Sequence, residues 1–139
     1  RIRSEEEVAG VASPSFYAGF QTRAERIKDQ FLLRLREVSA DGQRIGGYGA
    51  AAKGNTLLNY AGINSDLLPY VVDNNPMKVG KYLPGSRIPV VSERVLIEDN
   101  PEVVLVLPWN LEREVTSRLR DQYGWSGSIM TPMSDSIHL

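Results

Sequence analysis

Apolar residues recur every three or four positions along the first part of the chain, which is the spacing of one face of a helix. Charged residues fill the positions between them, and the apolar stripe consists of Phe16, Phe20, Ala24, Ile27, Phe31, Leu35 and Val38. Ser13 and Pro14 are typical of a helix start, as the cap and the first helical residue. The pattern therefore predicts a long amphipathic helix, and we interpret the polar, acidic residues 1–12 as a flexible linker before it.

After residue 43, short apolar runs alternate with segments of helical spacing. Strands are predicted at 44–48, 67–72, 87–91, 103–107 and 128–131, and helices at 50–61, at 92–97 and from 110 to the glycine at 124. The fourth run is continuously apolar, which is typical of a strand buried on both faces. Such alternation predicts a mainly parallel sheet with helices on both sides. We therefore expect an α/β, Rossmann-like, doubly wound fold of about five strands in the order 3-2-1-4-5.

Composition excludes several functions. The 139 residues fit one domain, which we assign to residues 13–139. The chain has no cysteine and its single histidine is the penultimate residue, His138, so thiolate metal sites and a histidine base inside the domain are excluded. A formal net charge of −1 argues against nucleic-acid binding. No apolar run reaches the ~20 residues of a membrane span and no secretory signal is visible, so we expect a cytoplasmic protein.

The segment that joins the first predicted strand to the next helix carries a ligand-binding signal. Residues 47–52 read Gly-Tyr-Gly-Ala-Ala-Ala and match G-x-G-x-x-A, a variant of the dinucleotide-binding fingerprint. In this pattern Gly47 permits the turn, Gly49 lets a phosphate approach the backbone, and Ala52 keeps the helix close to the sheet. Amides at the helix start, which we place at Ala50, then face the anion. The alternative is a tight turn that binds no ligand.

Residues at the ends of other strands are further candidates. Asp73 ends the second strand, where an acid would bind a ribose hydroxyl, and Asn75 either contacts the ligand or serves the turn. Trp109 and Asn110 follow the fourth strand, which neighbours the first, so both loops should line one crevice. Trp109 would stack on a base or sugar or pack at a domain interface, and Asn110 would bind ligand or cap the next helix. Tyr48 is a candidate because the turn does not require a bulky residue.

Residues 49–56 also approach the phosphate-binding pattern G-x-x-x-x-G-K-T. Gly54 matches the second glycine of this pattern, but Asn55 occupies the position of the lysine. The fourth strand runs into Pro108 rather than an acid that could hold magnesium. We therefore reject ATP hydrolysis. Lys53 either reaches a phosphate as a point charge or is an ordinary solvated lysine.

Four motifs in a fixed order give the chain a family resemblance. They are GGYGAAAKGNT at 46–56, VDNNPxKxGxYxPG at 72–85, IPV at 88–90 and VLPWN at 106–110. With this series the chain resembles, over about residues 13–132, the C-terminal domain of the S-adenosylmethionine-dependent sugar C-methyltransferases. Members of that family methylate a carbon of a nucleotide-linked keto-deoxysugar.

The resemblance implies that this domain is part of a larger, modular methyltransferase. An N-terminal zinc-binding domain, a central domain for S-adenosylmethionine and the family's catalytic Glu-His pair would lie outside this chain, which would hold no cofactor, metal or catalytic residue of its own. Its partners would be those two domains and a nucleotide-diphosphate sugar, expected to be a thymidine-diphosphate sugar (dTDP-sugar). The resemblance also implies which residues are candidates for binding this nucleotide sugar: Gly47, Tyr48, Gly49, Lys53, Asn55 and Asn110.

Two other functions remain open from the sequence. An NAD(P)-binding oxidoreductase fragment would retain the glycine pattern and Asp73. A non-catalytic interaction domain would use the long N-terminal helix to dock a partner.

Overall fold

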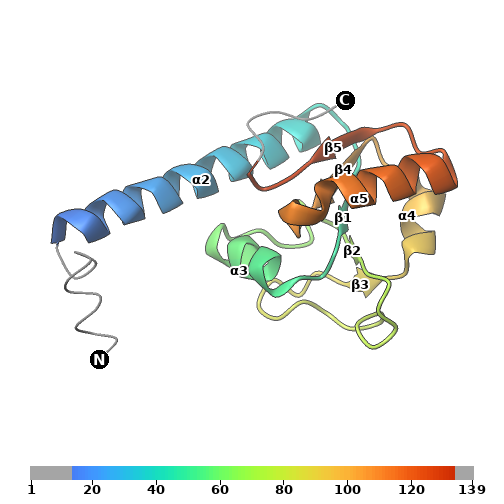
Figure 1. Ribbon diagram of the computed structural model, residues 1–139, viewed down its shortest axis with the longest axis horizontal. Coiled ribbons are helices and arrows are strands. Elements are labelled where there is room, and N and C mark those ends of the chain that lie inside the picture. The colour runs from blue at the N-terminus through green and yellow to red at the C-terminus, as the bar shows by residue number, and fades with distance from the viewer. Residues whose placement is uncertain (1–13, 134–139) are drawn as a thin grey trace.

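Five parallel strands form one sheet whose two faces are covered by helices (Figure 1). The computed structural model describes residues 14–133, with side chains from residue 22 on. The strands are β1 (Ile45–Tyr48), β2 (Val71–Val72), β3 (Val90–Val91), β4 (Val103–Val106) and β5 (Ser128–Met130). The α-helices are α2 (Pro14–Ala40), α3 (Ala52–Tyr60), α4 (Glu93–Asp99) and α5 (Glu112–Ser117), with a 3₁₀ helix η1 (Trp109–Leu111) and a π-helix η2 (Arg118–Gln122).

The strand order is β3-β2-β1-β4-β5, and every pairing within the sheet is parallel. The predicted α/β class, parallel sheet and strand order are therefore confirmed. Tyr48, at the end of β1, is in register with Val72 of β2 on one side and with Val106 of β4 on the other. The carboxyl ends of these three strands thus meet at one edge, which is where parallel sheets of this kind bind ligands.

Side chains of the interior strand β4, which lies between β1 and β5, alternate between two cores because successive residues of a strand point to opposite faces. Val103 and Leu105 pack in a cluster with Phe31 and Leu35 of α2. The cluster on the other face contains Val104 and Val106 together with residues of α4, α5 and η2. All residues of β4 are buried, as the uninterrupted apolar run predicts.

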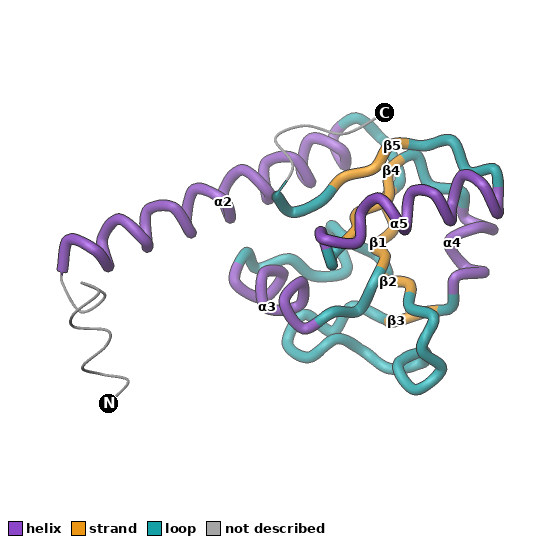
Figure 2. The backbone as a smooth tube through the Cα atoms, in the orientation of Figure 1, coloured by secondary structure: helices purple, strands orange, loops and turns teal. Residues whose placement is uncertain are grey.

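The C-terminal half of α2 packs on the sheet, whereas its N-terminal half extends away from it (Figures 1 and 2). Phe31 and Leu35 are buried, but Ile27 of the predicted stripe is 37% exposed. Arg34 Nη2 donates a hydrogen bond of 3.1 Å to the carbonyl of Pro132 and ties the helix to the segment after β5. The predicted linker 1–12, the cap at Ser13, the side chains of Phe16 and Phe20, and His138 lie outside the described residues.

Strands β2 and β3 are shorter than the predicted segments 67–72 and 87–91. Pro69 and Pro89 lack the N–H that a strand would donate to its neighbour. Arg87 has a φ of 60°, which turns the backbone out of the extended conformation. Extended pairing therefore begins only after these residues, and a long loop joins the two strands (Figure 2).

Candidate functional site

A cleft opens between the start of α3 and the segment that follows β4. Its cavity of about 470 Å³ is lined by Ala51, Ala52, Lys53, Pro108, Trp109 and Asn110. The residues come from the loops after the neighbouring strands β1 and β4. The prediction that these two loops line one crevice is confirmed.

Gly49 forms the turn from β1 into this cleft. Its φ is 93°, and a Cβ atom at this position would lie 2.5 Å from Cδ of Pro108. The position therefore requires glycine both for its backbone conformation and for its contact with the opposite wall. The prediction that Gly47 permits the turn is wrong, because Gly47 lies inside β1. A Cβ atom at this position would come within 2.9 Å of the side chain of Val71.

The amides closest to the turn are occupied by internal acceptors. The Ala50 N–H donates to Oδ2 of Asp73 at 2.9 Å, and the Ala51 N–H donates to the Gly49 carbonyl at 2.9 Å. Oδ1 of Asp73 accepts the Asn75 N–H at 2.8 Å. The expectation that the amide of Ala50 faces an anion is thus wrong, because the carboxylate predicted to bind a ribose reaches it first.

Available donors lie one step further along, in the first turn of α3. Asn55 makes the first intrahelical bond, from its N–H to the Ala51 carbonyl at 3.0 Å. The amides of Ala52, Lys53 and Gly54 precede it and have no acceptor among the described residues, as is usual for a helix start without a side-chain cap. Ala52 and Lys53 also line the cleft, so their N–H donors and the positive end of the helix dipole lie at its wall.

The loop after β2 holds the turn from the side opposite Pro108. Besides the bond from Asp73, Lys78 Nζ donates to the Ala50 carbonyl at 3.0 Å. Of the two interpretations of Asn75, the structure supports its role in the turn, because its Oδ1 accepts the Met77 N–H at 2.9 Å. Lys78 is not among the residues predicted for the site, although it is part of the motif at 72–85.

Gly54 allows α3 to pack closely on the sheet. A Cβ atom there would lie 2.7 Å from Cβ of Leu107, and Gly54 is buried. We had expected Ala52 to have this role, but Ala52 is exposed. The Oδ1 atom of Asn55 is buried and has no hydrogen-bond partner in the part of the chain that the structure describes.

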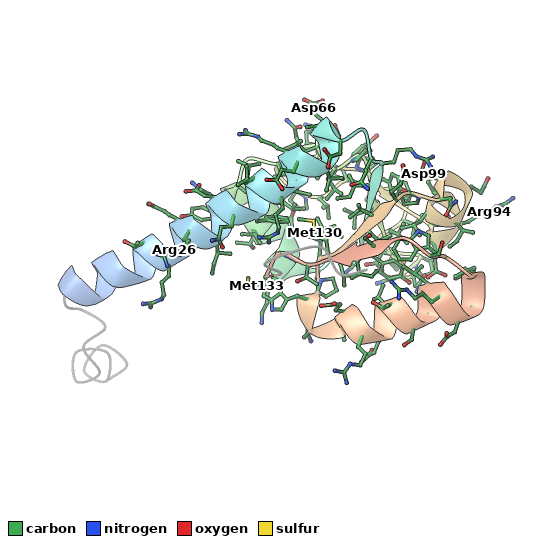
Figure 3. The ribbon with its side chains drawn as sticks, turned by 90° about the horizontal axis from the view of Figure 1, so that it is seen from above. Arg26, Asp66, Arg94, Asp99, Met130 and Met133 are labelled. Atoms are coloured by element: carbon green, nitrogen blue, oxygen red, sulfur yellow. The ribbon has the colours of Figure 1, made fainter. Side chains whose placement is uncertain are left out.

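A second cavity of about 350 Å³ continues from the first along α3. Its walls share Lys53 and Trp109 with the first cavity, and the complete lining is Lys53, Thr56, Leu57, Tyr60, Trp109 and Met133. Met133 lies beside the start of the helical segment after β4 (Figure 3). The site therefore has a polar part at the helix start and an apolar part beyond Trp109.

Asn110 is exposed and does not cap a helix. It is the middle residue of η1, and the N-cap positions of η1 and α5 are Pro108 and Leu111. The Leu111 N–H donates to the Pro108 carbonyl at 2.8 Å, so the 3₁₀ turn supplies its own acceptor. The cap interpretation is wrong, and the side chain of Asn110 lines the cleft.

Tyr48 points away from this cleft into the core on the other face of the sheet. It is 6% exposed, its hydroxyl donates to Glu93, and Nδ2 of Asn74 donates to that hydroxyl at 3.2 Å. Burial, and the hydrogen bond to Glu93, raise the pKa of Tyr48 to about 12. The expectation that Tyr48 contacts the ligand is therefore wrong. Tyr48 stands three residues after Ile45 in the same strand, so the two side chains point to opposite faces of the sheet.

Glu93 is the one buried acidic side chain in the described part of the chain. Nε and Nη2 of Arg118 donate to its two oxygens at 2.6 and 2.8 Å, and Tyr48 and Tyr123 donate to it as well. Burial raises the pKa of Glu93, but the hydrogen bonds from Arg118 and the two tyrosines outweigh it and hold the pKa at about 2. This cluster is not predicted from the sequence, where its only local signal is an acid in the first turn of a helix.

Within residues 14–133 no three His, Cys, Asp or Glu side chains are grouped so that they could hold a metal ion. No described helix combines the length and apolar character needed to cross a bilayer.

Together, these features define an α/β domain with a cleft at the carboxyl edge of a parallel sheet. The family model for the C-methyltransferase C-terminal domain matches residues 1–134. The chain is 33% identical over 132 residues to the C-methyltransferase NovU of Streptomyces niveus, which is 95% of this chain and 31% of that protein. The chain therefore belongs to the C-methyltransferase C-terminal domain family, as its motifs indicate, and spans about a third of the length of this curated relative. The alternative of an oxidoreductase fragment is set aside.

Proposed function

We propose that this Rossmann-like domain binds a nucleotide-diphosphate sugar and positions it for methylation by the S-adenosylmethionine-dependent centre of a larger enzyme. The observation that carries the proposal is the first turn of α3, where three amides have no acceptor among the described residues and two of them, at Ala52 and Lys53, belong to residues that line the cleft. A diphosphate would satisfy these donors and take advantage of the helix dipole. Lys53 lines the same cavity and adds a positive charge.

The apolar second cavity supports a ligand with a ring beyond its phosphates. Trp109 separates the two cavities, and Tyr60, which is 47% exposed, lies further along the wall. Aromatic faces of this kind stack on bases and on the apolar faces of sugars. Asn110 would add a polar contact near the phosphates.

In this proposal the chain contributes binding and orientation. Holding an acceptor carbon beside a donor methyl lowers the barrier through positioning. The base that removes the acceptor proton, S-adenosylmethionine and zinc would belong to domains outside this chain. The family membership supports this division of roles, because the domain is named as the C-terminal part of a C-methyltransferase.

Replacing Lys53 with methionine is expected to weaken the binding of thymidine 5′-diphosphate about tenfold. One charge-assisted hydrogen bond to a phosphate contributes about 1.5 kcal/mol, which is roughly a tenfold change in Kd. Isothermal titration calorimetry would measure the change. Thymidine without phosphates should bind the two proteins equally.

The control for this substitution is Lys81→Met, which removes the same charge from an exposed side chain that lies in neither cavity. It should leave the affinity within about twofold of wild type. Equal losses in the two variants would contradict the phosphate contact. Absence of any nucleoside-diphosphate binding by the full-length enzyme would contradict the proposed function.

A further inference from the structure

The buried carboxylate of Glu93 is linked to both loops that form the glycine turn. We propose that Glu93 is a positioning residue that fixes the turn at Gly49 and Ala50 through Tyr48 and Asn74. Glu93 does not line the cleft, so its effect on a ligand would be transmitted by Tyr48 and Asn74. Only the effect on ligand affinity rests on the proposed function, whereas the effect on the turn does not.

The first link runs through strand β1. The hydroxyl of Tyr48 is bound to Glu93, and the next residue along the chain is Gly49. The backbone at this point is held on both sides, because the Tyr48 carbonyl accepts the Leu107 N–H at 3.0 Å and the Gly49 N–H donates to the Val72 carbonyl at 2.7 Å. A fixed tyrosine ring therefore sets the direction in which the chain leaves the sheet.

The second link runs through the loop after β2. Nδ2 of Asn74 donates to the hydroxyl of Tyr48 at 3.2 Å. The neighbouring residue, Asp73, accepts the Ala50 N–H at 2.9 Å. Glu93 thereby reaches Gly49 through the chain and Ala50 through Asp73. A hollow of about 440 Å³ that is lined in part by Asp73, Asn74 and Glu93 lies over this connection.

The number of donors on Glu93 requires a carboxylate. It accepts two hydrogen bonds from Arg118, one from Tyr123 and one from Tyr48, and a carboxylate has about four lone-pair sites. A glutamine would place an NH₂ group against some of these donors. A structural ion pair with Arg118 would not need Tyr48, whose bond is the one that leads to the turn.

The rare π-helical segment η2 provides the geometry of this cluster. Arg118 and Tyr123 stand five positions apart, and at 3.6 residues per turn two such residues of an α-helix face different directions. A π-helix forms its hydrogen bonds over five residues and brings such positions to the same side. Both side chains reach Glu93, and the Arg118 guanidinium lies 5.9 Å from the centre of the Tyr123 ring. Turns of this kind are frequent at functional sites.

Two tyrosine-to-phenylalanine variants test the proposal, since each removes one hydrogen bond from the same carboxylate. Tyr48→Phe cuts the link to the turn. Tyr123→Phe removes the bond on the helix side. Tyr123 is 38% exposed, and its hydroxyl donates to Glu93 rather than to a residue of the turn. Amide hydrogen exchange would be measured at Gly49 and Ala50, and thymidine 5′-diphosphate affinity would be measured in the full-length enzyme.

We expect Tyr48→Phe to accelerate exchange of the Ala50 amide about tenfold and to weaken nucleotide binding about three- to tenfold, because both hydrogen bonds of the Tyr48 hydroxyl, to Glu93 and from Asn74, are lost. Tyr123→Phe should change both by less than about twofold. Asn74→Ala, which leaves the core unchanged, should reproduce the faster exchange if Tyr48→Phe does not fold. Equal exchange rates at Ala50 in the Tyr48 and Tyr123 variants would overturn the proposal. If exchange changes as expected but the wild-type enzyme binds no nucleotide, the positioning role stands and the proposed ligand fails.

Discussion

Gly49→Ala is expected to lower the free energy of unfolding by about 2–5 kcal/mol and to abolish ligand binding in the cleft. A side chain at a positive φ costs about 1–2 kcal/mol, and the φ of Gly49 is 93°. The new methyl group would also lie 2.5 Å from Cδ of Pro108, and such overpacking costs about 1–3 kcal/mol. Relief of the contact would separate the two walls of the cleft. Urea denaturation would measure the loss.

Gly62→Ala separates the two contributions. Gly62 also has a positive φ, 70°, but nothing lies within 4 Å of the position of its Cβ atom. It should lose only about 1–2 kcal/mol, from backbone strain. In addition, Pro108→Ala should recover part of the loss in a Gly49→Ala background, since it removes the atoms that collide. Losses of the same size at both glycines would mean that Pro108 yields and that the turn is less constrained than its geometry indicates.

The strand order and the position of the cleft could be predicted because both depend on patterns within short segments. An uninterrupted apolar run is enough to predict that β4 is an interior strand buried on both faces. The order then brings the loops after β1 and β4 together without knowledge of any side-chain contact. The family motifs are also local, and the family assignment agrees with them.

The donors and acceptors of the site could not be predicted because they depend on contacts between distant segments. From the sequence, Asp73 could bind either a ribose hydroxyl or a backbone amide. It binds the Ala50 amide because the loop after β2 approaches that residue. Likewise, either Ala52 or Gly54 could face the sheet, and the direction of α3 selects Gly54, whose neighbour is Leu107. The fingerprint thus indicates the correct strand-to-helix connection, but the helix begins at Ala52 rather than at Ala50, and the available amides lie correspondingly further along the chain.

The cluster at Glu93 is the clearest case of this limit. Its donors come from β1 and from the two ends of η2, and the pairs are separated by 45, 25 and 30 positions. No local pattern predicts that Arg118 and Tyr123 share one acceptor, because α-helical spacing would place them on different faces. The π-helix η2 instead brings them to the same side.

Arg118→Met is expected to destabilise the domain by about 2–3 kcal/mol at pH 7. Loss of one partner of a buried ion pair costs about 3–5 kcal/mol, and the value here is reduced because the side chain of Arg118 is 40% exposed while that of Glu93 is 9% exposed. Without the guanidinium, the carboxylate would be desolvated and retain only the hydrogen bonds from the two tyrosines. Chemical unfolding at a series of pH values would measure the effect.

The pH dependence distinguishes this mechanism from a loss of packing. In the wild type the pKa of Glu93 is lowered from 4.5 to about 2, so its stabilisation is complete above pH 4.5 and disappears as the pH falls toward 2. In Arg118→Met the pKa of Glu93 should rise, because burial is no longer offset by the guanidinium. Protonation on acidification therefore relieves the variant, and its difference in stability from wild type shrinks. Adding Glu93→Gln to Arg118→Met should recover much of the loss in stability at pH 7. The control is Arg113→Met, which replaces an exposed arginine on α5 and should change stability by less than about 0.5 kcal/mol. A difference between Arg118→Met and wild type that stays constant from pH 7 to pH 3 would show that Arg118 acts through packing and that its charge does not compensate Glu93.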